Sequence, residues 1–332
     1  MDMRRFVIRK TIYLVITLFA ILATNFFLFR VMPGDPVSAF ITKGLTEEAR
    51  EDLMESFHLN DSLPSQFYHY IIDVFHLDFG VTYSYVARQE VTSVIAPRLF
   101  NTFTLMILGT TIAIIAGIWL GRFVAWRRGQ AADAIGMMFT LTFYTMPTFI
   151  LALALVMLFG GRLDWFPLAG AHGELPFYDN PPAYSDMNLF EKIVSRLYHL
   201  ILPSMAFAIQ WMADFVLIMR NSLTDVLTED YIVTARAKGL SDEAILKDHA
   251  MRNALLPVVT VIAITIGWVV GGEIMVELIF SFEGIGQLTW DAVDKRDFPL
   301  LQALFLIIAI GVLIANLIAD MVYTYLDPRV KI

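Results

Sequence analysis

The chain has 332 residues, of which 57% are hydrophobic, and its mean hydropathy is +0.63. A soluble globular domain of this length does not carry so much apolar surface, so that class is excluded. The chain has no cysteine, which excludes disulfides, thiol catalysis and cysteine-ligated metal, and its net charge of −8 is unevenly distributed.

Apolar runs of about 20 residues recur along the chain, and that length crosses a hydrocarbon core of roughly 30 Å. Each run is predicted to be helical, because lipid offers backbone groups no other hydrogen-bond partner. The first run is too long for the apolar region of a signal peptide and no small-residue cleavage site follows it, so an uncleaved helix is expected. We predict an all-α polytopic membrane protein with six transmembrane helices, at residues 11–32, 100–121, 135–160, 200–219, 256–276 and 300–326.

The predicted organisation has three parts. Residues 1–32 form an N-terminal tail and the first span, 33–98 an extracytoplasmic cap, and 99–332 a five-helix core with a polar loop at about 220–256. Within the cap, Thr46 suits the N-cap of a helix, and an amphipathic helix is expected at 66–75 after Pro64. The second outer loop, 161–199, is predicted to be irregular, and the third, 279–298, is short and aromatic.

The distribution of basic residues predicts the orientation. Basic residues precede the first span, and Arg122, Arg127 and Arg128 lie between the second and third spans. Arg329 and Lys331 end the chain. Because Lys and Arg accumulate on the cytosolic side of a membrane protein, both termini are predicted to be cytosolic.

The same orientation places the polar segment 229–258 in the cytosol. Gly239 suits the position after a helix end where the backbone turns left-handed, and Ser241 suits the N-cap of a following helix. The segment is therefore predicted to be two helices around a turn, the first at about 225–238 and the second running toward Asn253. The pattern fits either an amphipathic hairpin packed on its own bundle or a surface on which a partner docks.

Catalytic and cofactor motifs are not found. The sequence has no HExxH, no GxSxG and no GxxxxGK[ST] phosphate loop, so the chain alone is not expected to bind ATP or hydrolyse it. The six histidines are scattered. His69 and His76 could share a helical face, but such pairs arise often by chance, and no metal site is predicted.

Polar side chains within the apolar runs are candidates for a substrate or proton pathway, because an ionisable group in lipid is costly unless it faces a cavity or a partner. They could equally be hydrogen-bonded within the bundle or lie near a wet helix end. Glu273 and Glu277 lie near the outer end of the fifth span. The pathway candidates are Asn25, Gln210, Asp214, Asn316 and Asp320.

Five sequence elements, in order, resemble the permease subunit of ABC importers of the dipeptide/oligopeptide/nickel class. They are PGDP at 33–36, LDFG at 77–80, TARAKGL at 234–240 with HAMRNALLPV at 249–258, ELIFSFEGIGQLTWDAVDKRDFP at 277–299, and DPR at 327–329. Each is weak alone, but together they run from one end of the chain to the other.

The resemblance implies the type I ABC importer permease fold and a set of partners. These are a second homologous permease, two cytosolic ATPase subunits that hold ATP and Mg²⁺, an extracytoplasmic solute-binding protein and the lipid bilayer. The TARAKGL region is similar to a loop whose coupling helix fits a groove on the ATPase. By this resemblance the coupling residues are Thr234, Ala235, Arg236, Ala237, Lys238, Gly239, Leu240 and Ser241.

The sequence departs from the general family pattern at two positions. Val233 stands where the general motif has glutamate, as in the peptide/nickel branch, and Glu283 replaces a proline in the third outer loop. The resemblance implies a transport subunit rather than an enzyme, with peptides as the first expected substrate and nickel complexes or oligosaccharides as alternatives. Two other classes stay open: a proton-coupled secondary carrier that uses Asp214 and Asp320, and an intramembrane enzyme.

Overall fold

The computed structural model describes residues 3–31, 60–82, 89–176, 182–266 and 269–326, together with Met54 and His58. Within these ranges the side chains of 3–7, 31 and 319–326 are outside the description. The PGDP and DPR elements and the helix start expected at Thr46 also lie outside the described residues.

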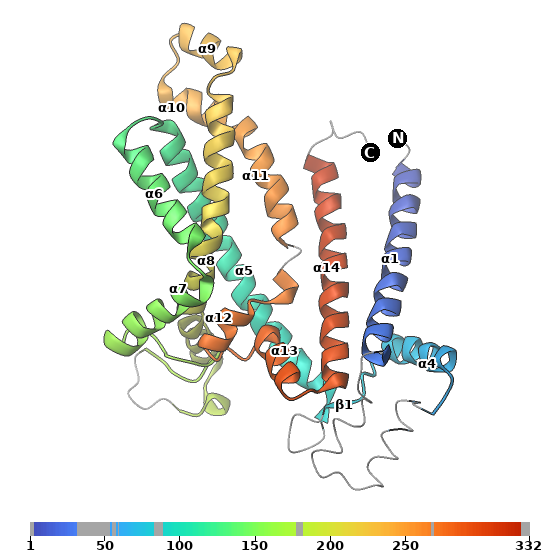
Figure 1. Cartoon of the computed structure of the whole chain (residues 1–332). Helices are drawn as coiled ribbons and strands as arrows, with labels where there is room; N and C mark the ends of the chain where they lie inside the picture. Colours follow the sequence, from blue (N-terminus) through green and yellow to red (C-terminus); the bar gives the residue numbers. More distant parts are fainter. Residues whose placement is uncertain are drawn as a thin grey trace.

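Long helices dominate the described chain (Figure 1). The N-terminal half contains α1 (Met3–Val31), α4 (Leu63–His76), the strands β1 (Val81–Thr82) and β2 (Gln89–Glu90), α5 (Val91–Trp126), α6 (Ala131–Thr145), α7 (Thr148–Leu155) and a π-helical continuation, η1 (Val156–Arg162). The C-terminal half contains η2 (Tyr184–Asp186), α8 (Leu189–Val226), α9 (Asp230–Ala237), α10 (Asp242–Ala244), η3 (Ile245–Ala250), α11 (Met251–Ile266), η4 (Val269–Gly271), α12 (Ile274–Ile279), α13 (Ile285–Asp294) and α14 (Phe298–Leu326).

The predicted membrane spans are present among the described residues. Five helical stretches are long and apolar enough to cross a membrane, and the bent pair α6 and α7 makes a sixth if it is counted as one span. The start of α1 and the end of α14 lie at the end of the bundle that carries α9 and α10 (Figure 1). We call this the hairpin end.

The third span is broken at Pro147 rather than straight. The axes of Ala131–Thr145 and Thr148–Arg162 differ by 102°. Met146 is extended, with ψ 125°, as expected for a residue whose α conformation clashes with a following proline. Pro147 therefore does more than kink this span, because it turns α7 sideways at the end of the bundle opposite the hairpin (Figure 1).

Several predicted boundaries were wrong. The fifth span ends at Gly271 instead of Val276, and α12 is a separate short helix after it. The third outer loop contains a full helix, α13, and the last part of the second outer loop belongs to α8, which begins at a capping box formed by Asn188 and Glu191. The start of α8 was missed because it lies in polar sequence, where hydrophobicity gives no signal and only the capping box marks the start.

A seam of small residues joins α5 to α8. Gly109, Ala113, Gly117 and Gly121 recur at every fourth position on α5, which places them on one helical face. A Cβ added at Gly109 or Gly121 would lie 2.7 Å from side-chain atoms of Phe207 or Met219 on α8. At Gly117 it would come closer still to the Phe215 side chain. The missing side chains let two long helices approach closely, as small residues do in membrane bundles.

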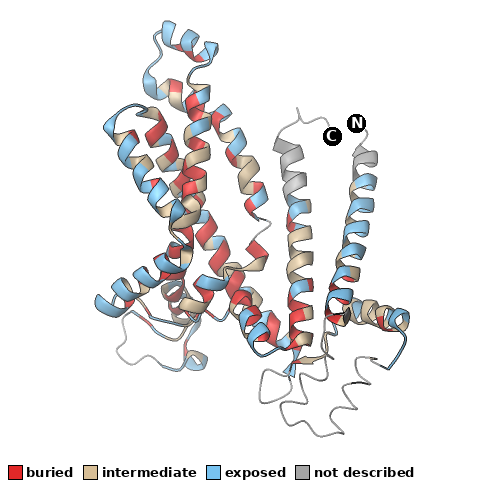
Figure 2. Cartoon of the chain, viewed as in Figure 1, coloured by how far each residue is buried: buried red, intermediate tan, exposed pale blue. Residues whose placement is uncertain are grey.

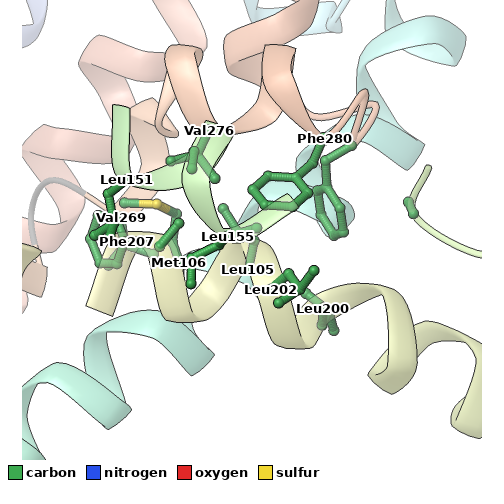
Figure 3. Close-up of a cluster of buried hydrophobic side chains, with 14 residues drawn as sticks. Leu105, Met106, Leu151, Leu155, Leu200, Leu202, Phe207, Val269, Val276 and Phe280 are labelled. Carbon is green, nitrogen blue, oxygen red and sulfur yellow. The ribbon is translucent and has the colours of Figure 1, made fainter. Parts of the chain in front are cut away.

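A buried apolar cluster fills the bundle at the bend of the third span. Figure 3 shows side chains from several elements converging there. They are Leu105 and Met106 of α5, Leu151 and Leu155 of α7, Leu200, Leu202 and Phe207 of α8, Val269 of η4, Val276 of α12, and Phe280. In contrast, α1 lies at the edge beside α14, and most of its described side chains are exposed, as expected for a lipid-facing helix (Figure 2).

Candidate functional site

The hairpin after α8 is shaped by its caps. Gly239 has φ +75°, and its N–H donates to the Arg236 carbonyl at 2.9 Å. The Leu240 N–H donates to the Ala235 carbonyl at 3.3 Å. This pair of bonds is the Schellman arrangement, which satisfies the last carbonyls of α9 and needs a left-handed residue that glycine supplies at least cost.

Ser241 then starts the second helix, as predicted. Its Oγ accepts a hydrogen bond from the Ala244 N–H at 3.3 Å. Beyond this cap, α10, η3 and α11 follow one another through Pro257 to Ile266. The first predicted helix, 225–238, was wrong in extent, because a turn at 227–229 separates α8 from α9.

The inner face of the hairpin packs into the apolar core of the helix bundle. Ile232 of α9 and Ile245 of η3 are fully buried. Together with Ala235 they belong to the same apolar cluster as Phe215 and Met219 of α8. Burying one isoleucine side chain contributes about 1.5–3 kcal/mol, so these anchors hold the hairpin firmly on α8.

The outer face of the hairpin is exposed. Val233 is 58% exposed and Leu240 is 40% exposed. Of the residues predicted to couple, Ala235 is buried and the others are exposed: Thr234, Arg236, Ala237, Lys238, Gly239, Leu240 and Ser241. The hairpin is therefore packed on its own bundle, as one alternative held, and its other face is exposed, so a docking surface stays a prediction.

A buried carboxylate organises the opposite end of the bundle. Glu277 of α12 is fully buried. Its Oε2 accepts the Gln287 N–H at 3.0 Å, and its Oε1 accepts the Thr102 hydroxyl at 2.9 Å. That hydroxyl in turn accepts the Ile285 N–H at 2.7 Å.

These contacts make Glu277 the cap of α13. Gly284 occupies the N-cap position of that helix and has no side chain, so Glu277 and Thr102 satisfy the free N–H groups in its place. A carboxylate at a helix N-terminus is also favoured by the helix dipole. Because Thr102 belongs to α5, the arrangement ties α12 and α13 to the helix that forms the seam.

Asp297 plays a similar role at the start of α14. It is 1% exposed, accepts the Leu300 N–H at 3.2 Å and accepts the Thr82 hydroxyl of β1. Glu277 and Asp297 are therefore structural anchors in this fold. Sequence reasoning did not give Glu277 this role, because it caps α13, a helix to which it does not belong.

An ion pair fastens α6 to α8 near the hairpin end. The Arg220 guanidinium donates to both oxygens of Asp133. Its Nε lies 2.8 Å from Oδ1, and its Nη2 lies 3.0 Å from Oδ2. Gly129 N–H also donates to this carboxylate at 3.1 Å. Such a two-pronged pair fixes direction as well as distance. Sequence reasoning missed it, because the two residues are far apart in the chain.

Two of the pathway candidates form hydrogen bonds within the bundle. Asn25 donates to the Gln302 carbonyl at 3.3 Å and accepts the Tyr70 hydroxyl at 2.9 Å, which joins α1 to α14 and α4. Gln210 accepts the Thr148 hydroxyl, which joins α8 to the start of α7. These residues therefore belong to two separate contacts rather than to one cluster.

The remaining candidates are less engaged. Asp214 is half-buried on α8, and no described residue hydrogen-bonds or pairs with it. Asn316 is exposed on α14, and the Asp320 side chain lies outside the described residues. A proton path that uses Asp214 and Asp320 has no geometric support among the described residues.

Residues 113–332 match the family described as "Binding-protein-dependent transport system inner membrane component", and residues 3–106 match its N-terminal companion family.

Two curated relatives are similar along nearly the whole chain. A probable peptide ABC transporter permease protein, y4tP of Sinorhizobium fredii, is 33% identical over 92% of both chains. The oligopeptide transport system permease protein AppB of Bacillus subtilis is 33% identical over 99% of this chain and 100% of its own.

A solved structure has a similar fold. It is a chain from an inward-facing structure of the MetNI methionine ABC transporter, with 14% sequence identity and a TM-score of 0.55. The match covers 71% of this chain and 97% of that chain. At this identity the likeness concerns the fold, which is that of a type I ABC importer permease, as predicted.

Proposed function

We propose that this protein is a permease subunit of an ATP-driven importer. The chain belongs to the family of binding-protein-dependent transport system inner membrane components. In this proposal it forms half of a translocation pathway with a second, homologous permease. Two ATPase subunits bind below it, and a solute-binding protein delivers substrate from above. The family makes it a multi-pass membrane protein.

The observation that supports coupling is the two-faced hairpin. Its outer face carries exposed apolar and basic side chains, while its inner face shares a core with α8 and α5. A displacement applied to α9 would be passed to α8 as a rigid body, because packed interiors resist compression. We propose that this hairpin is the coupling element, and that Arg236, Lys238 and Leu240 face the ATPase.

The substrate proposal is a peptide. The curated relatives are described as peptide and oligopeptide permeases. Nickel complexes and oligosaccharides are alternatives carried by the wider family resemblance. The proton-coupled carrier gains no support from these relatives, and no described contact links Asp214 to a second titratable group.

The docking proposal is tested by capture of the ATPase encoded beside this chain, using the full-length permease from detergent-solubilised membranes. Arg236→Glu and Leu240→Glu are each expected to remove most of the captured ATPase, because both alter the exposed face without touching a buried anchor. Arg128→Glu is the matched control, since Arg128 is exposed in the turn between α5 and α6 and lies outside the hairpin. Full capture by both hairpin variants, at normal membrane insertion, would overturn the coupling role.

The substrate proposal needs a separate experiment. The adjacent solute-binding protein is screened with dipeptides, longer peptides, Ni²⁺ complexes and oligosaccharides, and the best ligand is then offered to the reconstituted transporter with ATP. Peptide binding with ATP-dependent uptake is the expected result. Uptake by this chain alone under a proton gradient, lost in Asp214→Asn, would instead establish the carrier.

A further inference from the structure

Two histidines and an aspartate meet where the chain enters α4. His58 and Asp61 lie before the helix, in a turn closed by the Asp61 N–H donating to the His58 carbonyl at 3.0 Å. His69 lies in the second turn of α4. The chain folds back so that the three side chains come together, although His58 and His69 are separated by the start of the helix.

The ligand atoms of the three side chains already lie near coordination distance. One nitrogen of each histidine and one Asp61 oxygen are all within 4.8 Å of one another. His58 Nδ1 and Asp61 Oδ2 lie 3.7 Å apart. Two ligands on the same tetrahedral zinc ion, each bound at about 2.0–2.1 Å, are about 3.4 Å apart. Side-chain rotations that shorten the longest of these ligand–ligand distances by roughly 1.4 Å would bring the three atoms to that spacing.

The two imidazole rings lie face to face. They stack with centroids 4.0 Å apart and planes 12° apart. A ring nitrogen of imidazole is the commonest metal ligand among side chains. Within the described part of the chain no hydrogen bond occupies the His69 ring nitrogens, while Asp61 Oδ2 accepts the Ser65 hydroxyl at 3.1 Å and is thereby oriented.

The histidines also border a cavity through which an ion can reach them. It has a volume of about 350 Å³ and is lined by both rings, by Asp73 of α4 and by Arg30 of α1. Asp73, one helical turn after His69 on α4, lines the same cavity and offers a further carboxylate there.

We propose that His58, Asp61 and His69 form a binding site for a divalent first-row transition-metal ion, of which Zn²⁺ and Ni²⁺ are the best matched. Imidazole nitrogen and carboxylate oxygen suit these ions, whereas Mg²⁺ and Ca²⁺ prefer all-oxygen sites. Three protein ligands leave a fourth position for water or for Asp73. A bound ion would join the segment before α4 to the helix itself. The sequence predicted no metal site and paired His69 with His76, because it could not show that His58 folds back onto α4.

The site is tested on the full-length permease in lipid nanodiscs, purified with a tag that contains no histidine. After treatment with EDTA, the protein is titrated with ZnCl₂, NiCl₂ and MgCl₂, and bound metal is counted by mass spectrometry. One Zn²⁺ or Ni²⁺ per chain is expected, with no Mg²⁺. Binding should weaken as the pH falls, because protons compete for the imidazoles. Co²⁺ should give the visible absorption of a four-coordinate site.

Matched variants decide the assignment. His69→Gln and Asp61→Asn are each expected to weaken Zn²⁺ binding by more than about a hundredfold. Losing a residue that only hydrogen-bonds to a metal ligand already weakens binding by up to about a hundredfold, and a ligand itself should matter more. His76→Gln is the control, since His76 lies on the same helix, is exposed, and directs its Nδ1 to the Ile72 carbonyl at 2.9 Å. Unfolding temperature in EDTA confirms that each variant is folded. Equal binding by the His69 and His76 variants, or no bound metal in the unaltered protein, would overturn the proposal.

Discussion

The α5–α8 seam and the α9–η3 hairpin are built on the same helix by opposite means. The seam is made by side chains that are missing, because Gly109, Gly117 and Gly121 leave room for α8 to come close. The hairpin is made by its ends, through the left-handed turn at Gly239 and the Ser241 cap. Altering the seam should therefore affect the whole bundle, and altering the hairpin should affect only its own turn.

The connection between the two regions is α8 itself. Phe215 and Met219 face the seam and also belong to the cluster that receives Ile232 and Ile245 from the hairpin. The seam and the hairpin are thus a global and a local element that share one core. Variants that alter only one of them show how much of the hairpin's rigidity comes from the bundle on which it packs.

The largest expected effect is at the seam. Gly117→Leu places a branched side chain against Phe215, where not even a methyl group fits. Neither long helix can move aside without losing its other contacts, so the cost should reach about 3 kcal/mol or more, the upper range for overpacking. The measurement is thermal unfolding of the purified permease, followed by size-exclusion chromatography. Ala96→Leu is the control, because Ala96 lies on an exposed face of the same helix.

The seam also shows what the sequence could predict. The number and approximate position of the spans followed from apolar runs, and the Gly239 turn and Ser241 cap followed from local rules for helix ends. The seam, the Glu277 cap of α13 and the Asp133–Arg220 pair did not, because each depends on residues far apart in the chain.

The second prediction concerns the polar anchor at the other end of α5. Thr102→Val removes the hydroxyl that donates to Glu277 and accepts the Ile285 N–H. Both groups then stay buried with a lost partner, which should lower the unfolding free energy by about 1–3 kcal/mol. Thr111→Val is matched in chemistry and helix, but its hydroxyl is exposed and bonds only to the Ile107 carbonyl. Equal destabilisation by the two variants would contradict the anchoring role.

The third prediction tests the local character of the hairpin. Gly239→Ala forces an alanine into φ +75°, which costs about 1 kcal/mol. Hydrogen exchange of the amides in 236–244 should quicken by roughly fivefold, since 1.4 kcal/mol corresponds to a factor of ten. Lys238→Ala, next to it and without this strain, should change nothing. A fall in the global unfolding temperature of the Gly239 variant comparable to that of the seam variant would show that the two regions are not separable.

The smallest effect is expected at a loop remote from both regions. His172 is half-buried, and its ring stacks on Tyr184 with centroids 3.9 Å apart. Burial lowers the pKa of His172 from its ordinary value of 6.5, the charge of Arg196 lowers it further, and Glu283 opposes this. The unfolded chain therefore binds the proton more readily, so this residue's contribution to stability is present above pH 6.5 and is lost as the pH falls toward the folded pKa.

Acidification should thus loosen this loop before it affects the seam or the hairpin. Hydrogen exchange of 163–176 is compared at about pH 7.5 and about pH 5.5, after correction for the intrinsic pH dependence of exchange, since this interval brackets the ordinary titration of histidine. The acid-dependent increase should disappear in His172→Gln and persist in His76→Gln, whose side chain is exposed. An equal acid response in the hairpin would mean that the loop is coupled to the hairpin through α8. That helix contains Arg196 and ends at Val226, just before the turn that leads into α9.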